Sequence, residues 1–443
     1  MTGNDSHRDV RRAIDTVWRI ESPRLIAGLA RMVRDVGLAE ELAQDALVAA
    51  LEHWPADGVP DNPGAWLMAT GKRRAIDRLR RNTLIQRKHE EFGHELEDRQ
   101  MDAFDKPPDD DGRLEDDIGD DLLRLVFTAC HPVLSTEAQV ALTLRLLGGL
   151  GTDEIARAFL QSEATVAQRI VRAKRTLSDR QVPFEVPRRD DLRERLASVL
   201  GVIYLIFNEG YAATAGDDLM RPALCGEALR LGRVLAGLMP LESEVHGLVA
   251  LMEIQASRAG ARVAADGTPI VLLQQDRARW DRLMIARGLA ALQRAEQLGG
   301  ARGPFALQAA IAACHARAVE AADTDWPRIA ALYAILAQVA PSPVVELNRA
   351  VALGMAEGPA AGLALVEALA DEPALRQYHL LPAVRGDLLG KLGRHGEARV
   401  EFERAAGLTR NGRERALLLG RAAGCGTGEG GAGGVPGTPA PTE

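Results

Sequence analysis

Apolar residues recur at helical spacing along much of this 443-residue chain. Leu38, Leu42 and Ala46 form one such stripe, and the segment 166–177 carries another. Residues three or four positions apart share one face of an α-helix, so each stripe predicts a helix with one buried side. Aromatic residues make up only 4% of the chain, which argues against the strands that they favour. We therefore expect an all-α fold.

Charge is unevenly distributed along the sequence. The formal net charge is −8, which by itself argues against a nucleic-acid ligand. However, residues 72–88 contain eight basic residues and one acid, whereas residues 90–121 contain fifteen acids and three bases. A basic segment can bind phosphates whatever the total charge, so its presence favours a nucleic-acid partner.

Composition divides the chain into successive parts. We expect helices over 9–88, a disordered acidic linker over 89–120, further helices over 121–182, a long helical array over 190–420 and a disordered Gly/Pro-rich tail over 424–443. The linker is either a plain tether or an acidic decoy that covers basic surfaces when DNA is absent. Within the array, Leu380–Leu408 reads as two helices joined at residues 392–398, a pattern similar to tetratricopeptide repeats.

Residues 151–177 have the pattern of a helix–turn–helix. Thr152 is expected to cap a short helix over 153–159, and Ser162 a second helix after a turn at residues 160–161. Polar side chains that could enter a major groove lie on the second helix: Thr165, Gln168, Arg169, Arg172 and Arg175. The alternative is an amphipathic surface helix whose charges are merely solvated.

A second basic helix is expected over residues 66–81. Leu67, Ile76 and Leu79 would anchor it, while Trp66 would either stack on an unpaired base or belong to the core. Phosphate-binding side chains cover much of the rest: Lys72, Arg73, Arg74, Arg78, Arg80 and Arg81. Such a helix predicts salt-dependent binding to nucleic acid.

In this order, the motifs resemble the extracytoplasmic-function (ECF) group of the sigma-70 family. Residues 39–47 with Trp54 resemble its polymerase-binding helix, residues 63–81 its promoter-melting helix and residues 134–177 its region 4. The resemblance covers roughly residues 9–180. Arg73 is a departure, because many members carry Asn there, and this puts the base preference at the upstream edge of the melted DNA in doubt.

The rest of the chain is similar to a subgroup whose sigma core is fused to a tetratricopeptide-like C-terminal extension. Its signatures resemble residues 127–132, 204–211, 275–281, 309–316 and 341–350. An array of helix pairs presents a concave surface for a protein or peptide partner. Because the array is covalently attached through the acidic linker, the parts meet at high effective concentration, so we predict that it regulates the sigma core in cis.

The resemblance implies roles for individual residues. Glu41, Gln44 and Asp45 would face the clamp of the RNA polymerase core enzyme. Trp66 and the basic residues of 72–81 would bind and melt the −10 element of promoter DNA, with Asp77 orienting neighbouring arginines. The loop 56–62 would contribute base specificity. The five groove-facing residues of the helix after Ser162 would read the −35 element.

We expect no enzymatic activity, no cofactor and no metal site. The four cysteines have no metal-ligand or redox spacing, and no apolar run reaches the length of a membrane span, so we expect a cytoplasmic protein. Polar residues at 208–211 and 275–281 suggest an enzyme pocket, but such residues more often cap helices and satisfy buried backbone groups. His131, Cys314 and His315 are expected to have structural roles.

Two other functions compete with that of a sigma factor. A helix–turn–helix regulator that acts without polymerase would explain residues 151–177 but leaves residues 39–54 and 66–81 unexplained. An enzyme with its site between residues 200 and 290 lacks a nucleophile–base pair, a phosphate loop or a metal motif.

Overall fold

The computed structural model describes residues 3–90, 121–214, 216, 218–264 and 267–425. It divides into two compact units, unit 1 (Met1–Val202) and unit 2 (Ile203–Glu443), each described here by itself. The described ranges are built from helices and contain two isolated β-bridges but no β-strand, which confirms the predicted all-α fold. The predicted linker lies outside these ranges except for residues 89 and 90, and so does the predicted tail from residue 426 on.

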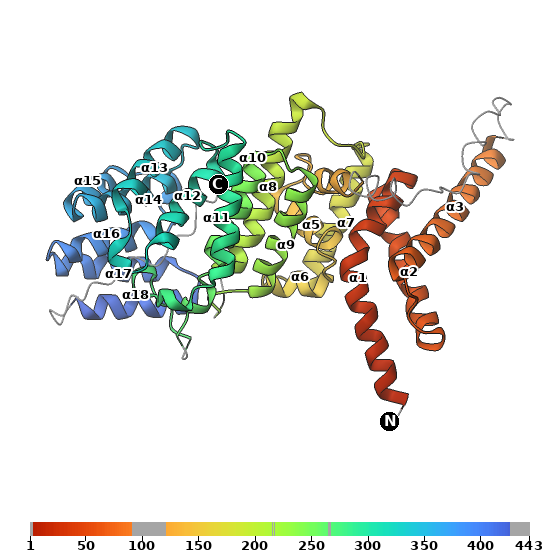
Figure 1. Cartoon of the computed structure of the whole chain (residues 1–443), viewed down its shortest axis with the longest axis horizontal. Helices are drawn as coiled ribbons and strands as arrows, with labels where there is room; N and C mark the ends of the chain where they lie inside the picture. The colour runs from red at the N-terminus through yellow and green to blue at the C-terminus, as the bar shows by residue number, and fades with distance from the viewer. Residues whose placement is uncertain (1–2, 91–120, 215, 217, 265–266, 426–443) are drawn as a thin grey trace. The chain divides into compact units, whose positions relative to one another are not determined.

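The first half of unit 1 is a bundle of three helices, α1 (Gly3–Val33), α2 (Val36–Asp57) and α3 (Pro63–Glu90), red to orange in Figure 1. Asp35 caps α2 by accepting a hydrogen bond from the Leu38 amide at 2.8 Å. The helix continues through Pro55 and stops at Gly58, whose φ of +87° breaks the helical path.

The second half of unit 1 contains the helical segment 121–129, α5 (Thr136–Leu146), α6 (Thr152–Ala158) and α7 (Glu163–Asp179). Helix α7 packs against both α5 and α6. The start of α8 (Arg189–Tyr211) belongs to this unit as well, because Arg195 donates to the Phe127 carbonyl at 2.8 Å and Ser198 to the Cys130 carbonyl at 3.1 Å.

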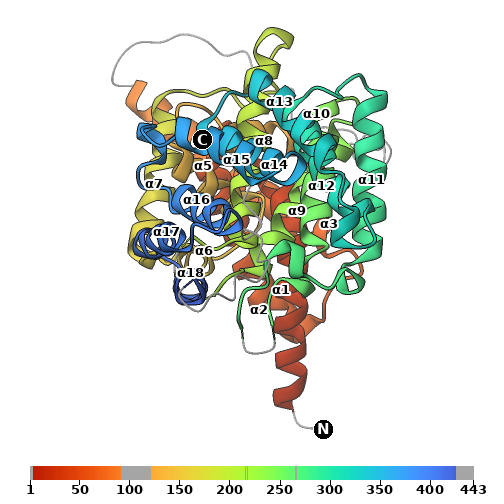
Figure 2. The same ribbon diagram turned by 90° about the vertical axis from the view of Figure 1, so that its left-hand side faces the viewer.

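Unit 2 is a succession of antiparallel helices in which each packs on its neighbours along the chain. They are α9 (Pro222–Leu238), α10 (Ser243–Ala256), α11 (Arg282–Gln297), α12 (Pro304–Arg317), α13 (Trp326–Val339), α14 (Pro343–Ala356), α15 (Pro359–Ala368), α16 (Leu380–Lys391), α17 (His395–Leu408) and α18 (Gly412–Gly424). Figure 2 shows α11 through α18 following one another around the unit.

The predicted helix pair of residues 380–408 is present as α16 and α17. Ala398, Phe402 and Ala405 are buried between them, as the spacing indicated. Gly386 permits the close approach, because a Cβ atom there would lie 3.0 Å from the Phe402 ring. Small residues at helix crossings are the means by which such pairs pack closely.

Candidate nucleic-acid and polymerase interface

Helix α3 packs on the bundle along a narrow row of residues, of which one is large and two are small. Leu67, Gly71 and Ala75 are buried at four-residue spacing, and a Cβ atom on Gly71 would lie 3.0 Å from the Leu29 side chain. Of the three predicted anchors, Leu67 is confirmed because it is 1% exposed, whereas the prediction is wrong for Ile76 and Leu79, which are 37% and 36% exposed. Beyond Leu67, the small residues Gly71 and Ala75 allow the two backbones to approach, so no further large anchor is needed on this face.

The basic residues of α3 cover the rest of its surface. Arg73, Arg78, Arg80 and Arg81 are exposed, and Lys72 and Arg74 are half-buried. Arg74 forms an ion pair with Asp45 at 3.4 Å, and the other five form no ion pair with a residue that the structure describes. We call the six residues the basic face of α3. Their charges are available to phosphate groups.

Trp66 lies against the core rather than in open solvent. Its ring meets Trp54 edge to face, with centroids 5.4 Å apart, and Trp54 is only 2% exposed. Because Trp66 itself is half-buried, its outer edge remains accessible on the same helix as the basic face of α3. This position is compatible with both predicted roles of Trp66, packing in the core and stacking on an unpaired base.

The predicted polymerase-binding residues on α2 differ in their surroundings. Glu41 and Asp45 are exposed, whereas Gln44 is half-buried and donates to the Glu40 carboxylate at 2.7 Å. Asp77 on α3 is also exposed and forms no ion pair with a described residue, so the structure gives no support for its predicted role in orienting arginines.

The helix–turn–helix is formed by α6 and α7. Ser162 caps α7 as predicted, accepting a hydrogen bond from the Thr165 amide at 3.1 Å. The cap predicted for α6 is wrong, because the N-cap is Gly151 and not Thr152. Glu154 accepts from the Gly151 amide at 2.7 Å, which is the carboxylate half of a capping box, and Gly151 has no side chain to form the other half.

Helix α7 has one buried side and one polar side. Val166, Ile170, Ala173 and Leu177 are buried, which confirms the predicted stripe. The polar side, which we call the reading face, consists of Thr165, Gln168, Arg169, Arg172 and Arg175, of which only Arg169 is not fully exposed.

Two arginines of the reading face are engaged by neighbours. Arg169 donates to the Gln161 amide oxygen at 2.8 Å and Arg175 lies 3.3 Å from Asp179. The Arg172 guanidinium has no hydrogen bond to the described residues. Exposed pairs of this kind contribute little, so these side chains can exchange them for contacts with DNA.

A buried carboxylate joins the two halves of unit 1, and sequence analysis did not identify it. Glu40 on α2 is 2% exposed and forms ion pairs with Arg145 of α5, at 2.6 Å, and with Lys174 of α7. We call these three residues the Glu40 cluster. Burial alone would raise the pKa of Glu40, but the two cations outweigh it and hold the pKa below its ordinary value.

Further polar contacts accompany the Glu40 cluster. Ser178 donates to Asp35 at 2.8 Å and Arg31 lies 3.2 Å from Asp121. Beside them is a cleft of about 930 Å³ lined by residues of α1, α2 and α7. The contact between the halves is therefore polar and incompletely packed, as expected of surfaces that can separate. Lys174 and Ser178 do not belong to the reading face, which stays exposed.

The polar residues that suggested an enzyme pocket have mainly structural roles. Asp276 and Asp281 cap the following helical turns, and Arg277 donates to the His315 carbonyl at 2.7 Å. Cys314 and His315 are buried. No group of three or more His, Cys, Asp or Glu in the described ranges is arranged to hold a metal ion. Across the same ranges, every helix is too short or too polar to span a bilayer.

Three family models match this chain. Residues 18–85 match Sigma-70 region 2, residues 124–177 match Sigma-70, region 4, and residues 195–296 match a family of unknown function, DUF6596. An uncharacterized protein of Rhizobium meliloti (strain 1021) is 44% identical over 406 residues, which are 91% of this chain and 94% of that protein. No solved structure matches.

Proposed function

Because this chain belongs to the sigma-70 family, we propose that it is an ECF-type initiation factor. We further propose that its helical C-terminal extension controls its activity. Sigma-70 proteins bind the RNA polymerase core enzyme and promoter DNA. One observation carries the assignment of surfaces: unit 1 presents two separate basic helix faces, one on α3 and one on α7. A repressor that reads duplex DNA needs only the second.

We assign the −10 element to the basic face of α3. Five of its six cations have no carboxylate partner among the described residues, so binding to a strand would displace few internal pairs. Trp66 is accessible at one edge and is rigidly held by Trp54, which suits stacking on an unpaired base. Unstacking a base costs a few kcal/mol, which stacking and charge pairing together offset.

We assign the −35 element to the reading face of α7. Arginine forks match the edge of guanine, and each such contact contributes about 1–3 kcal/mol of discrimination. Glu41 and Asp45 on α2 supply an exposed acidic surface for the polymerase clamp.

Binding of both elements requires unit 1 to open at the Glu40 cluster. The two elements lie about 25 base pairs apart, which at about 3.4 Å per base pair is roughly 85 Å of duplex. Helix α3 packs on α2, and α2 contacts α7, so the basic face of α3 and the reading face of α7 cannot serve both elements at that separation while this contact persists. We therefore propose that the structure is a closed state, and that polymerase and promoter stabilise the open one.

Association with polymerase separates this function from that of a regulator that binds DNA alone. We expect the full-length chain to co-elute with purified core enzyme in gel filtration. An Asp45→Lys, Glu41→Lys double variant should bind at least tenfold more weakly, because it reverses two charges on the acidic surface. A wild-type chain that binds promoter duplex but elutes apart from core enzyme would support the regulator instead.

Control by the C-terminal extension can be tested by removing it. The cut belongs after Val202, because Arg195 and Ser198 of α8 bind the Phe127 and Cys130 carbonyls within unit 1. We expect promoter-directed transcription by residues 1–202 to differ severalfold from that of the full-length chain, while binding to core enzyme persists. Equal transcription by both proteins would refute control in cis.

A further inference from the structure

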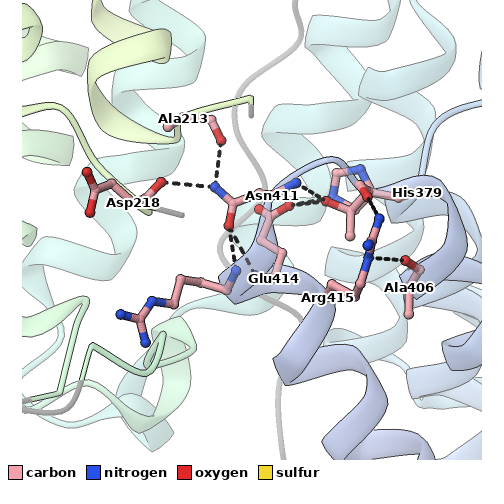
Figure 3. Close-up of polar contacts among 9 residues, drawn as sticks. Ala213, Asp218, His379, Ala406, Asn411, Glu414 and Arg415 are labelled. Carbon is pink, nitrogen blue, oxygen red and sulfur yellow. Dashed lines mark hydrogen bonds and ion pairs between the residues drawn. The ribbon is translucent and has the colours of Figure 1, made fainter. Parts of the chain in front are cut away.

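Unit 2 is closed by contacts between its first and last segments. The Asn411 amide donates to the Ala213 and Asp218 carbonyls at 3.1 and 3.0 Å, although these residues lie almost two hundred positions earlier in the chain (Figure 3). Next to it, Glu414 accepts from Thr409 at 2.8 Å and lies 3.2 Å from His379. The closure places the start of α18 against the segment that follows α8.

Three buried arginines gather beside this closure. Arg258, Arg262 and Arg277 are 8%, 8% and 5% exposed. Arg262 donates to the Tyr211 carbonyl and lies 3.7 Å from the centre of its ring. Arg277 donates to two backbone carbonyls and to the Thr324 hydroxyl. None of the three forms an ion pair with a carboxylate of the described residues.

Arg258 has the fewest partners of the three. Its guanidinium carbon lies 5.8 Å from the Tyr211 ring centre and 5.9 Å from that of Trp280, and its Nε is buried with no hydrogen bond. Aromatic faces offset only a small part of the cost of a buried cation. Buried charges in proteins are normally paired, so Arg258 lacks a counterion.

The electrostatic surroundings of Arg258 are positive. Burial, and then the charges of Arg258 and Arg277, lower the pKa of His315 to about 3. Burial and the nearby Arg258 likewise lower the pKa of Arg277 and contribute to lowering that of Arg262. Glu414 is the one acid among the residues lining the adjoining cavity; it is bound by Thr409 and His379, and its charge also interacts with that of Arg262.

A cavity of about 40 Å³ adjoins these groups. Arg258, Arg262 and Gln275 form part of its wall, and the Gln275 side-chain oxygen is buried without a hydrogen bond. The remaining wall is largely aliphatic, with Ile270, Leu380 and Leu417 among its residues. This volume accommodates a few non-hydrogen atoms, since one water needs about 10–15 Å³ by the same measure.

We propose that this cavity binds a carboxylate group with a short aliphatic body, held by the guanidinium of Arg258. The planar fork of arginine matches the two oxygens of a carboxylate, which would supply the missing counterion. The aliphatic wall fits the ligand's carbon atoms, and the small volume disfavours a nucleotide or a sugar phosphate. Because the cavity is lined from both ends of unit 2, a bound carboxylate would stabilise the closure at Asn411.

The chemistry fits either a free short-chain acid or the carboxyl end of a peptide. Propionate represents the first, and tetra-alanine with a free carboxyl end the second. Tetra-alanine with an amidated end is the matched control, because it keeps the aliphatic body and loses the charge.

Calorimetric titration of the full-length chain, with chloride replacing each ligand at constant ionic strength, tests the site. We expect propionate, or the free but not the amidated peptide, to bind the wild type and to raise its unfolding temperature. Arg258→Gln should bind at least tenfold more weakly, whereas Arg287→Gln, at an exposed arginine of α11, should bind as the wild type does.

Several results would overturn the proposal. The first is that the wild type binds none of the three ligands more strongly than it binds chloride, and the second is that it binds the free and the amidated peptide equally. The third is that it binds inorganic phosphate in preference to propionate. The fourth is that Arg258→Gln binds the ligand as strongly as the wild type does. The wild-type titrations decide the question even where the Arg258 variant does not fold. The outcome does not depend on whether the chain binds polymerase.

Discussion

At the scale of single residues, Glu40 shows how a buried charge can hold a structure and remain reversible. Its carboxylate is almost fully enclosed, but Lys174 and Arg145 are 20% and 24% exposed. The pair therefore loses less solvation than a fully buried one would. Apolar residues in place of the Glu40 cluster would hold the two halves together permanently, whereas these ion pairs can be exchanged for contacts with polymerase and DNA.

We predict that Glu40→Gln weakens the contact between the halves of unit 1. The substitution leaves Lys174 and Arg145 without their counterion, at a cost of about 3 kcal/mol, near the lower end for breaking a buried pair. Faster hydrogen exchange in α2 and α7 of the full-length chain would report the loss. Glu41→Gln is the control, because Glu41 is exposed on the same helix and forms no such cluster. Equal exchange in both variants would contradict the assignment.

The pH dependence of this contact follows from the lowered pKa of Glu40. A carboxyl whose pKa is lower in the folded than in the unfolded state stabilises the fold above its ordinary pKa, here 4.5. That contribution is lost as the pH falls from there through the folded-state pKa. The difference between wild type and Glu40→Gln should therefore be constant from pH 6 to 8 and shrink below about pH 4.5.

Among the helices, α3 and α7 differ in their exposed side chains, and the difference suits α3 to a single strand and α7 to duplex DNA. Helix α3 carries most of its charge on arginines without internal partners, which suits sequence-independent contact with a strand. Helix α7 mixes arginine with Thr165 and Gln168, and such side chains can distinguish base edges.

The salt dependence of binding distinguishes these designs. Removing two phosphate contacts from α3 with Arg80→Ala, Arg81→Ala should lower the slope of log affinity against log salt by about 1.4 for a single strand. The measurement is binding of forked promoter DNA by the protein with core enzyme. Arg12→Ala, at an exposed arginine of α1, should leave the slope unchanged. A slope that the double variant does not change would exclude these residues from the DNA contact.

The local features of these helices were predictable from the sequence, and the long-range ones were not. The stripe Val166 to Leu177 and the Ser162 cap depend on neighbouring residues alone, and both are present. Size as the sign of an anchor identified Leu67 correctly but misassigned Ile76 and Leu79, because Gly71 and Ala75 make the rest of the contact. Nothing near Glu40 in the sequence indicates that its partners lie more than one hundred positions away.

Across the whole molecule, local features were predictable from the sequence and long-range contacts were not, and this holds for both units. In unit 2 the sequence predicted a helical array and one helix pair, residues 380–408, but not that Asn411 joins the last segment to the first. Nor could the sequence place Arg258 beside Arg262 and Arg277, because that depends on how successive turns stack. The candidate carboxylate site could therefore be identified only from the folded structure, whereas the basic helices of unit 1 could be predicted from the sequence.

If unit 1 opens, the distance between α2 and α7 should increase greatly. Fluorophores on Val48→Cys of α2 and Val171→Cys of α7, both exposed positions, should transfer energy efficiently in the free protein. Transfer should fall close to zero with core enzyme and promoter, because the two DNA elements lie roughly 85 Å apart. A pair within the first bundle, Ile20→Cys with Val48→Cys, should not change. Efficient transfer retained between α2 and α7 in a transcribing complex would contradict the closed-to-open model.

Run-off transcription with purified core enzyme on a library of promoter fragments tests the central claim most directly. The account predicts transcripts that begin at defined sites, depend on the full-length chain and share two sequence elements about 25 base pairs apart. It also predicts that Arg172→Ala selectively relaxes the upstream element, because its guanidinium is free on the reading face. Core enzyme that initiates equally with and without the protein on every fragment would contradict the account.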